Sequence, residues 1–103
     1  MIPTKEEMHQ ALSERHGAEL QKKISAARVA VCGLGGLGSN IAIALARAGV
    51  GHLHLIDFDR VDITNLNRQQ YFLKDLGQYK TEALRSNLRQ INPFIDITID
   101  TVK

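Results

Sequence analysis

The chain has 103 residues, 44% hydrophobic and 23% charged, with a net charge of +2, the composition of one ordinary globular domain or part of one. Its single cysteine excludes an internal disulfide. The sequence contains no Cys-x-x-Cys pair, so it gives no indication of a structural zinc site. Residues 1–7 are charged and lack the apolar core of a signal peptide, and no apolar run is long enough to span a bilayer. We therefore expect a cytoplasmic protein with no membrane or nucleic-acid partner.

Two short helices are expected in the segment 1–27, which precedes the main domain. Thr4 and Glu7 have the spacing of a capping box, and Gly17 is a suitable residue to end the first helix. The second helix, 18–25, carries Leu20 and Ile24 on one face. These helices either cover the edge of a sheet or form a subunit contact, and the sequence leaves both alternatives open.

A strand–helix–strand pattern follows. The segment 28–32 is apolar after Arg28 and rich in valine, which predicts a strand buried on both faces. The alanine-rich segment 39–48 predicts a buried helix that ends at Gly49. The second strand, 52–57, alternates His52 and His54 with leucines, and we interpret both histidines as residues of a strand face because no third metal ligand lies nearby.

The rest of the chain continues the alternation. Residues 59–71 are polar and irregular, residues 78–91 have helical periodicity, and residues 96–102 alternate like a half-exposed strand. The order β-α-β-loop-α-β predicts a Rossmann-like, doubly wound α/β fold with a mainly parallel sheet. Since three strands make a small sheet, we expect residues 28–103 to be the N-terminal part of a larger nucleotide-binding domain.

A glycine-rich turn joins the first strand to its helix. Gly33-x-Gly35-x-x-Gly38 has the spacing of a dinucleotide- or nucleotide-binding loop, in which the backbone approaches a phosphate at a helix N-terminus. Asp57 lies about 20 residues beyond Gly38, at the end of the second strand, where such folds place a ribose-binding carboxylate. These features alone are equally typical of an NAD-dependent oxidoreductase.

A group of amide and cationic side chains just beyond the second strand favours phosphate chemistry instead. Asn65, Asn67, Arg68 and Lys80 all follow within about two dozen residues of Asp57. Arginine presents a fork for phosphate oxygens and lysine a compact charge, both suited to a triphosphate and to charge developing at phosphorus. Hydride transfer would leave Arg68 and Lys80 without a task.

Four separated blocks of sequence resemble the ThiF/MoeB family: Gly33 to Asn40, Asp57-Phe58-Asp59, Asn65 to Gln69, and Gly77 with Lys80. Ser39-Asn40 and Gln69-Gln70-Tyr71 look most like the ThiF branch, which serves thiamine biosynthesis. The resemblance implies adenylation by ATP of the C-terminal glycine carboxylate of a ubiquitin-fold sulfur-carrier protein such as ThiS. It also implies a homodimer.

The same resemblance implies roles for individual residues. The ATP-binding set is Gly33, Gly35, Gly36, Leu37, Gly38, Asp57, Asp59, Asn65, Arg68 and Lys80. Within it, Asp57 holds the ribose, and Arg68 and Lys80 act as the catalytic cations. Asp59 either helps to hold Mg²⁺ or caps backbone N–H groups of its loop.

Some family features are missing from residues 1–103. The principal Mg²⁺-binding aspartate is expected beyond Lys103, and no Arg-x-x-Arg-Gln element supplies an arginine finger. We expect Arg15 to face solvent and Cys32 to be a buried structural residue. The alternatives to the carrier adenylyltransferase are an NAD-binding oxidoreductase, a non-catalytic nucleotide-binding module and a related tRNA-modifying dehydratase.

Overall fold

A three-stranded parallel sheet forms the centre of the molecule in a computed structural model that describes residues 2–102. The strands are β1 (Arg28–Cys32), β2 (His52–Ile56) and β3 (Asp96–Asp100), and they pair in the order β1-β2-β3. Arg28 lies opposite His52, which lies opposite Asp96. The predicted Rossmann-like fold is therefore confirmed, and the chain forms one βαβαβ unit of it.

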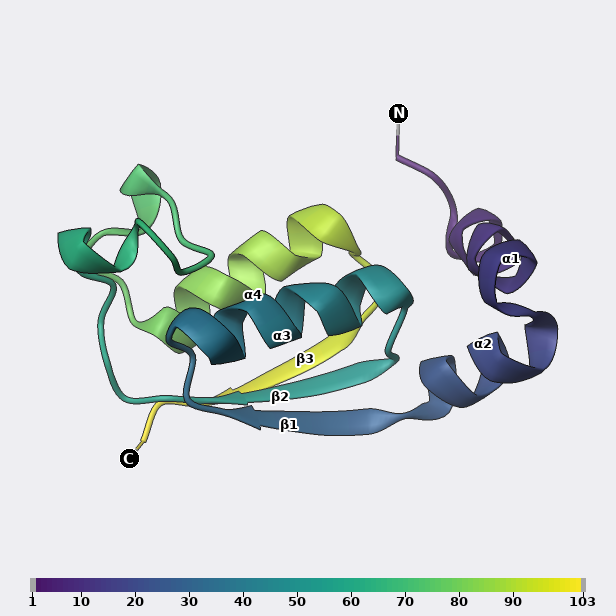
Figure 1. Cartoon of the computed structure of the whole chain (residues 1–103), viewed down its shortest axis with the longest axis horizontal. Helices are drawn as coiled ribbons and strands as arrows, with labels where there is room; N and C mark the ends of the chain where they lie inside the picture. Colours follow the sequence, from purple (N-terminus) through teal and green to yellow (C-terminus); the bar gives the residue numbers. More distant parts are fainter. Residues whose placement is uncertain (1, 103) are drawn as a thin grey trace.

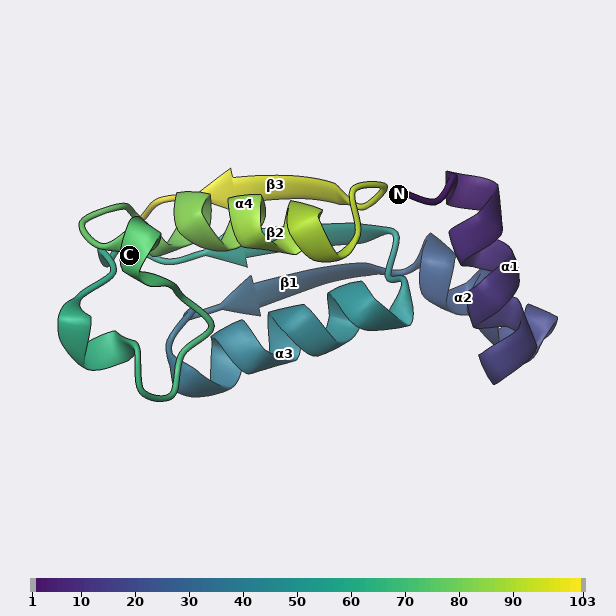
Figure 2. The same cartoon turned by 90° about the horizontal axis from the view of Figure 1, so that it is seen from above.

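Two helices connect the strands and lie over the same face of the sheet, α3 (Gly36–Ala48) and α4 (Lys80–Ile91). Figure 1 shows both above the sheet, and Figure 2, viewed from above, shows them side by side. Apolar side chains from both layers make up the core: Val31, Leu53, Leu55 and Ile97 from the sheet, and Ala42, Ala46, Leu84 and Leu88 from the helices.

The opposite face of the sheet carries no helix within residues 2–102 (Figure 1). The prediction that the first strand is buried on both faces is wrong for this reason, since Arg28, Ala30 and Cys32 are exposed. The histidines lie on this open face, as predicted: His52 Nδ1 is 2.9 Å from the Asp96 carboxylate and His54 Nε2 is 3.0 Å from that of Asp100.

Helix α3 begins three residues before the predicted start, at Gly36. It ends at Gly49, whose φ of 88° places it in the left-handed region that glycine tolerates. The prediction of a wholly buried helix is wrong, because only Ser39, Ala42 and Ala46 are buried. Helix α4 and strand β3 lie within their predicted segments.

The helices α1 (Lys5–His16) and α2 (Ala18–Ala26) lie beyond the starting ends of the strands (Figures 1 and 2). The predicted capping box is present: the Glu7 N–H donates to Thr4 Oγ1 at 3.1 Å, and the Thr4 N–H donates to Glu7 Oε1 at 3.0 Å. The buried residue of α2 is Gln21, whereas Leu20 is 51% exposed. Of the predicted apolar stripe, Ile24 packs against the core and Leu20 does not, and the helices do not cover a sheet edge.

Between β2 and α4 the chain forms an irregular segment with two 3₁₀ turns, η1 (Ile63–Asn65) and η2 (Leu73–Asp75). This segment lies at the opposite end of the sheet from α1 and α2 (Figure 1). Among residues 2–102, no helix combines the length and apolar character needed to cross a membrane.

Gly36 and Gly38, in the first turn of α3, provide a matched test of this packing. A Cβ atom at Gly38 would collide with the carbonyl oxygen of Gly33, whereas a Cβ at Gly36 would only touch Arg68 at 3.6 Å. We expect Gly38→Ala to lower the free energy of unfolding by about 3 kcal/mol or more. Gly36→Ala should change it by less than about 1 kcal/mol. Urea unfolding of both variants without nucleotide measures the difference, and equal losses would contradict this geometry.

Candidate nucleotide-binding site

The turn after β1 brings free backbone donors to the carboxyl end of the sheet. Gly33 has a φ of 86°, and its N–H donates to the Ile56 carbonyl at 2.8 Å, so the chain leaves β1 while still bound to β2. The chain then enters α3 at Gly36. The first N–H groups of a helix have no partner within it, and they carry the positive end of its dipole. The predicted phosphate loop is thus a concave backbone surface that is suited to an anion.

Asp57 ties this turn to the end of β2. Its Oδ2 accepts a hydrogen bond from the Leu34 N–H at 2.7 Å, and its Oδ1 accepts one from the Asp59 N–H at 2.7 Å. Only 8% of the residue is exposed. A carboxylate accepts about four hydrogen bonds, so these two leave acceptor capacity for a ligand hydroxyl. Asp57 therefore has a structural role that its sequence position did not reveal.

Arg68 lies beside the glycine turn, as its predicted phosphate-binding role requires. Its Cδ and Nε atoms are 3.6 Å from the position that a Cβ of Gly36 would occupy, and the residue is exposed. The Asn40 side chain, on α3, donates to the Arg68 carbonyl at 3.2 Å. The Asn40 hydrogen bond therefore holds the Arg68 backbone next to the N-terminus of α3, and it does not use the Arg68 guanidinium group.

Gln70 and Tyr71, which follow Arg68 in the same loop, bind the loop to α3 and to the glycine turn. The Gln70 N–H donates to Ser39 Oγ at 3.2 Å, and the Tyr71 hydroxyl donates to the Leu34 carbonyl at 2.7 Å. Burial raises the pKa of Tyr71, and the charges of Asp57 and Asp75 raise it further, so the hydroxyl remains a donor. In the sequence, Gln70 and Tyr71 contribute only to the family resemblance, and their spacing does not indicate which backbone groups they contact.

The remaining predicted site residues, Lys80 and Asn65, differ in whether their side chains already have partners within the protein. Lys80, the first residue of α4, is 6% exposed, and its N–H donates to the Asp59 carbonyl at 2.9 Å. Its ammonium group forms none of the ion pairs found among residues 2–102. Asn65 caps its own turn, because its Oδ1 accepts from the Asp62 N–H at 2.8 Å. The Nδ2 amino group of the Asn65 side chain remains for a ligand.

Cys32 is exposed, which contradicts its prediction as a buried residue beneath the loop. The reason is that it lies on the open face of the sheet rather than under α3. Arg15 is exposed in the last turn of α1, as predicted.

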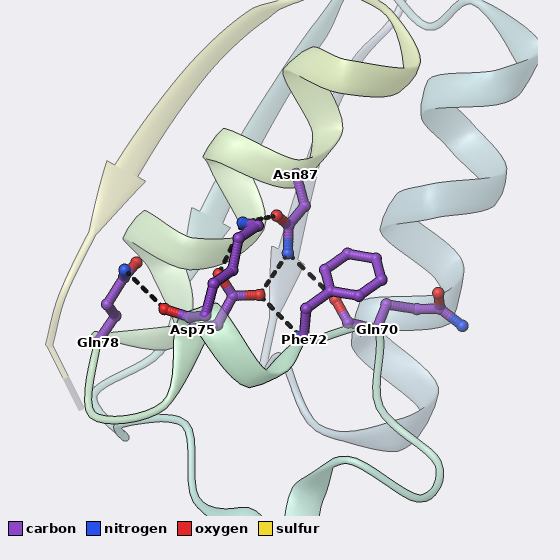
Figure 3. Close-up of polar contacts among 6 residues, drawn as sticks. Gln70, Phe72, Asp75, Gln78 and Asn87 are labelled. Carbon is purple, nitrogen blue, oxygen red and sulfur yellow. Dashed lines mark hydrogen bonds and ion pairs between the residues drawn. The ribbon is translucent and has the colours of Figure 1, made fainter.

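A buried polar network holds the loop against α4 (Figure 3). The Asp75 carboxylate accepts hydrogen bonds from Asn87 Nδ2 at 2.8 Å, the Phe72 N–H at 2.8 Å and Lys74 Nζ at 3.0 Å. Asn87 Nδ2 also reaches the Gln70 carbonyl at 3.5 Å. Burial alone would raise the pKa of Asp75, but these hydrogen bonds and the Lys74 charge outweigh it and hold the pKa below its usual range.

Two observations concern the glycine turn and the loop that faces it. A Cβ at Gly38 would collide with the Gly33 carbonyl oxygen, so this glycine lets α3 pack closely against the turn. Gln69 is 7% exposed and its Oε1 has no hydrogen-bond partner among the described residues, so a bound ligand or water is left to satisfy it. Residues 2–102 contain no group of three His, Cys, Asp or Glu side chains that could hold a metal ion.

These features define a βαβαβ unit with a glycine turn at the carboxyl end of its sheet and Arg68 beside the N-terminus of α3. The ThiF family model matches residues 8–103, and the chain belongs to the ThiF family.

Two relatives illustrate the range of the family. The tRNA threonylcarbamoyladenosine dehydratase of Escherichia coli is 42% identical over 85 residues, which are 82% of this chain and 32% of that protein. The molybdopterin-synthase adenylyltransferase of Salmonella typhimurium is 49% identical over 81 residues, 78% of this chain and 32% of the relative. The chain thus spans about a third of the length of these relatives.

Two solved structures have a fold similar to that of this chain. The dehydratase of E. coli in complex with ATP has a TM-score of 0.89 and 32% identity, covering 99% of this chain and 43% of that chain. E. coli MccB with ATP has a TM-score of 0.81 and 30% identity, covering 89% of this chain and 31% of that chain. Both solved structures contain ATP, consistent with the site described above.

The Asp75 network makes a pH-dependent contribution to stability. A carboxyl whose pKa is lowered on folding stabilises the folded state above its unfolded pKa, near 4, and this stabilisation is lost as the pH falls through the folded pKa. We expect Asp75→Asn to lower the free energy of unfolding by about 2 kcal/mol at pH 7. The deficit should shrink below pH 4. Urea unfolding at pH 7 and pH 3 measures it, with the exposed Glu82→Gln as control. A deficit independent of pH would contradict this role.

Proposed function

We propose that the chain supplies the nucleotide-binding part of an ATP-dependent adenylyltransferase. The observation that carries this proposal is the position of the Arg68 side chain against Gly36, at the N-terminus of α3. A turn that only binds a dinucleotide does not need an exposed guanidinium group at this point. Nucleotidyl transfer does, because negative charge develops on the phosphate oxygens. The adenylyltransferases among the relatives support the same chemistry.

The residues divide the work between holding the nucleotide and stabilising charge. The backbone from Gly35 to Gly38 holds the phosphates, and the free acceptor capacity of Asp57 holds the ribose hydroxyls. A substrate carboxylate attacks the α-phosphorus, the bond to the bridging oxygen breaks, and pyrophosphate leaves with the electron pair. Arg68 and Lys80 neutralise the negative charge that develops on the phosphate oxygens.

Asn65 and Asp59 have supporting roles in this proposal. The side-chain amide group of Asn65 is free to donate to a phosphate oxygen, since its carbonyl oxygen already caps the turn. Asp59 is exposed, and as one carboxylate it contributes to Mg²⁺ binding only together with the phosphates. A cytoplasmic location and a homodimer belong to the same proposal.

We assign the carboxylate to the C-terminal glycine of a ThiS-like ubiquitin-fold carrier, as in thiamine biosynthesis. Ubiquitin-like modifier-activating enzyme 5 of Caenorhabditis elegans, 42% identical over 78 residues, supports an acceptor of this fold. A second candidate is the modification of a tRNA nucleoside, favoured by the likeness to the tRNA dehydratases of E. coli and Bacillus subtilis.

The acceptor is tested with the full-length protein in ATP–pyrophosphate exchange with Mg-ATP. We expect exchange when a ThiS-like carrier is added, and none when the carrier lacks its C-terminal glycine. Turnover of a threonylcarbamoyladenosine-bearing tRNA, without exchange on the carrier, would favour the second candidate. Thermal stabilisation by NAD but not by ATP would overturn the adenylyltransferase proposal itself.

Removal of the cations tests the assigned roles. We expect Arg68→Gln and Lys80→Gln each to lower the exchange rate on the order of 10²–10³-fold, because each deletes a fixed charge beside the reacting phosphate. The matched control is Arg89→Gln, an exposed cation in the last turn of α4. It should retain the full rate. Normal exchange in both site variants would show that these cations do not act on the phosphates.

A further inference from the structure

A short antiparallel ribbon joins the chain that leaves β2 to the chain that enters α4. The Val61 N–H donates to the Gln78 carbonyl at 2.8 Å, and the Lys80 N–H donates to the Asp59 carbonyl at 2.9 Å. The Asp59 N–H in turn donates to Asp57 Oδ1 at 2.7 Å. The ribbon therefore connects the backbone of Lys80, the first residue of α4, to the carboxylate assigned to the ribose.

Arg60 closes this ribbon with its side chain. It pairs with Tyr79 as the opposite residue of an antiparallel bridge, an arrangement that places both side chains on the same face of the ribbon. The Arg60 Cζ atom lies 4.0 Å from the centroid of the Tyr79 ring, and Arg60 Nη1 donates to the Gly77 carbonyl at 2.8 Å. One guanidinium group thus contacts both the start and the end of the segment 77–79 that precedes Lys80.

The ribbon needs such a contact, because its backbone alone fixes it weakly. An isolated pair of short antiparallel strands is marginally stable in water. Gly77 has a φ of 85°, a conformation that gives the chain ahead of Lys80 the freedom of a glycine hinge. A planar guanidinium group can stack on a ring and donate to a carbonyl at the same time, which the point charge of a lysine cannot do.

We propose that Arg60 is a positioning residue for nucleotidyl transfer, and that its contacts with Gly77 and Tyr79 hold Lys80 in place beside the phosphates. This inference rests on the proposed function, which assigns the Lys80 ammonium group to the phosphate charge. Position matters here because a misplacement of about 1 Å in a catalytic group can cost on the order of 10²-fold in rate. The Arg60 guanidinium group already contacts a carbonyl and a ring, so Arg60 acts through Lys80 and not on the nucleotide.

The first test measures ATP–pyrophosphate exchange by full-length variants with Mg-ATP and a ThiS-like carrier. We expect Arg60→Gln to lower the exchange rate about tenfold, since both contacts are lost. Tyr79→Leu should lower it about threefold, whereas Tyr79→Phe, which keeps the ring, should restore the full rate. The matched control is Arg47→Gln, an exposed arginine in the last turn of α3, which should retain the full rate. A full rate in Arg60→Gln would overturn the proposal.

Combination with Lys80→Gln separates positioning from direct contact. In the Lys80→Gln background, Arg60→Gln should lower the exchange rate by less than about twofold, because the group that Arg60 positions is already absent. A loss as large as in the wild-type background would show that Arg60 acts on the nucleotide or on the fold as a whole. That outcome would overturn the proposal.

Amide hydrogen exchange, followed by NMR on the full-length protein without nucleotide, tests the contacts independently of the reaction. Arg60→Gln should speed exchange of the Lys80 and Val61 amides about tenfold and leave that of Leu34, which donates to Asp57, unchanged. Unchanged exchange of the Lys80 amide would overturn the inference, even in an active enzyme. Absence of pyrophosphate exchange in the wild-type protein would reject the proposed function, and the Lys80 amide would still decide whether Arg60 positions Lys80.

Discussion

The nucleotide site depends on one carboxylate that bridges two loops. Asp57 accepts from the Leu34 N–H with one oxygen and from the Asp59 N–H with the other. The first contact holds the turn that follows β1, and the second holds the chain as it leaves β2. Because the residue is buried, both hydrogen bonds are made where water competes poorly. The phosphate loop is thus positioned before any nucleotide binds, and the binding energy need not order it.

Hydrogen bonds attach the irregular segment between β2 and α4 to both α3 and α4. Ser39, Asn40 and Leu34 bind its backbone or side chains from one direction, and Asn87 on α4 binds it from the other. Asp75 completes this attachment as a buried carboxylate with three donors. A segment that resembles a solvated loop in sequence is therefore attached to the two helices beside it through the residues that flank Arg68.

The open face of the sheet shows how position in a fold overrides composition. Parallel strands are usually covered on both faces, and the apolar run of β1 predicts this. In residues 2–102, α3 and α4 both lie on one face, so the exposed positions of β2 and β3 pair His52 with Asp96 and His54 with Asp100 instead. These hydrogen-bonded pairs give both histidines a partner on the sheet, and neither histidine belongs to the nucleotide site.

The sequence by itself determined the order of the strands and helices, the glycine turn and the acid at the end of β2, because each of these depends on local periodicity or on residue spacing. It also predicted Arg68 and Lys80 as the catalytic cations, of which the structure places Arg68 beside Gly36. Only the tertiary structure decided that Asp57 joins two loops, that Tyr71 and Gln70 fasten the Arg68 loop, and that Gln21 rather than Leu20 seats the N-terminal helices. Those contacts join residues far apart in the chain, and a hydrogen bond to a backbone group leaves no pattern in the sequence of its partner.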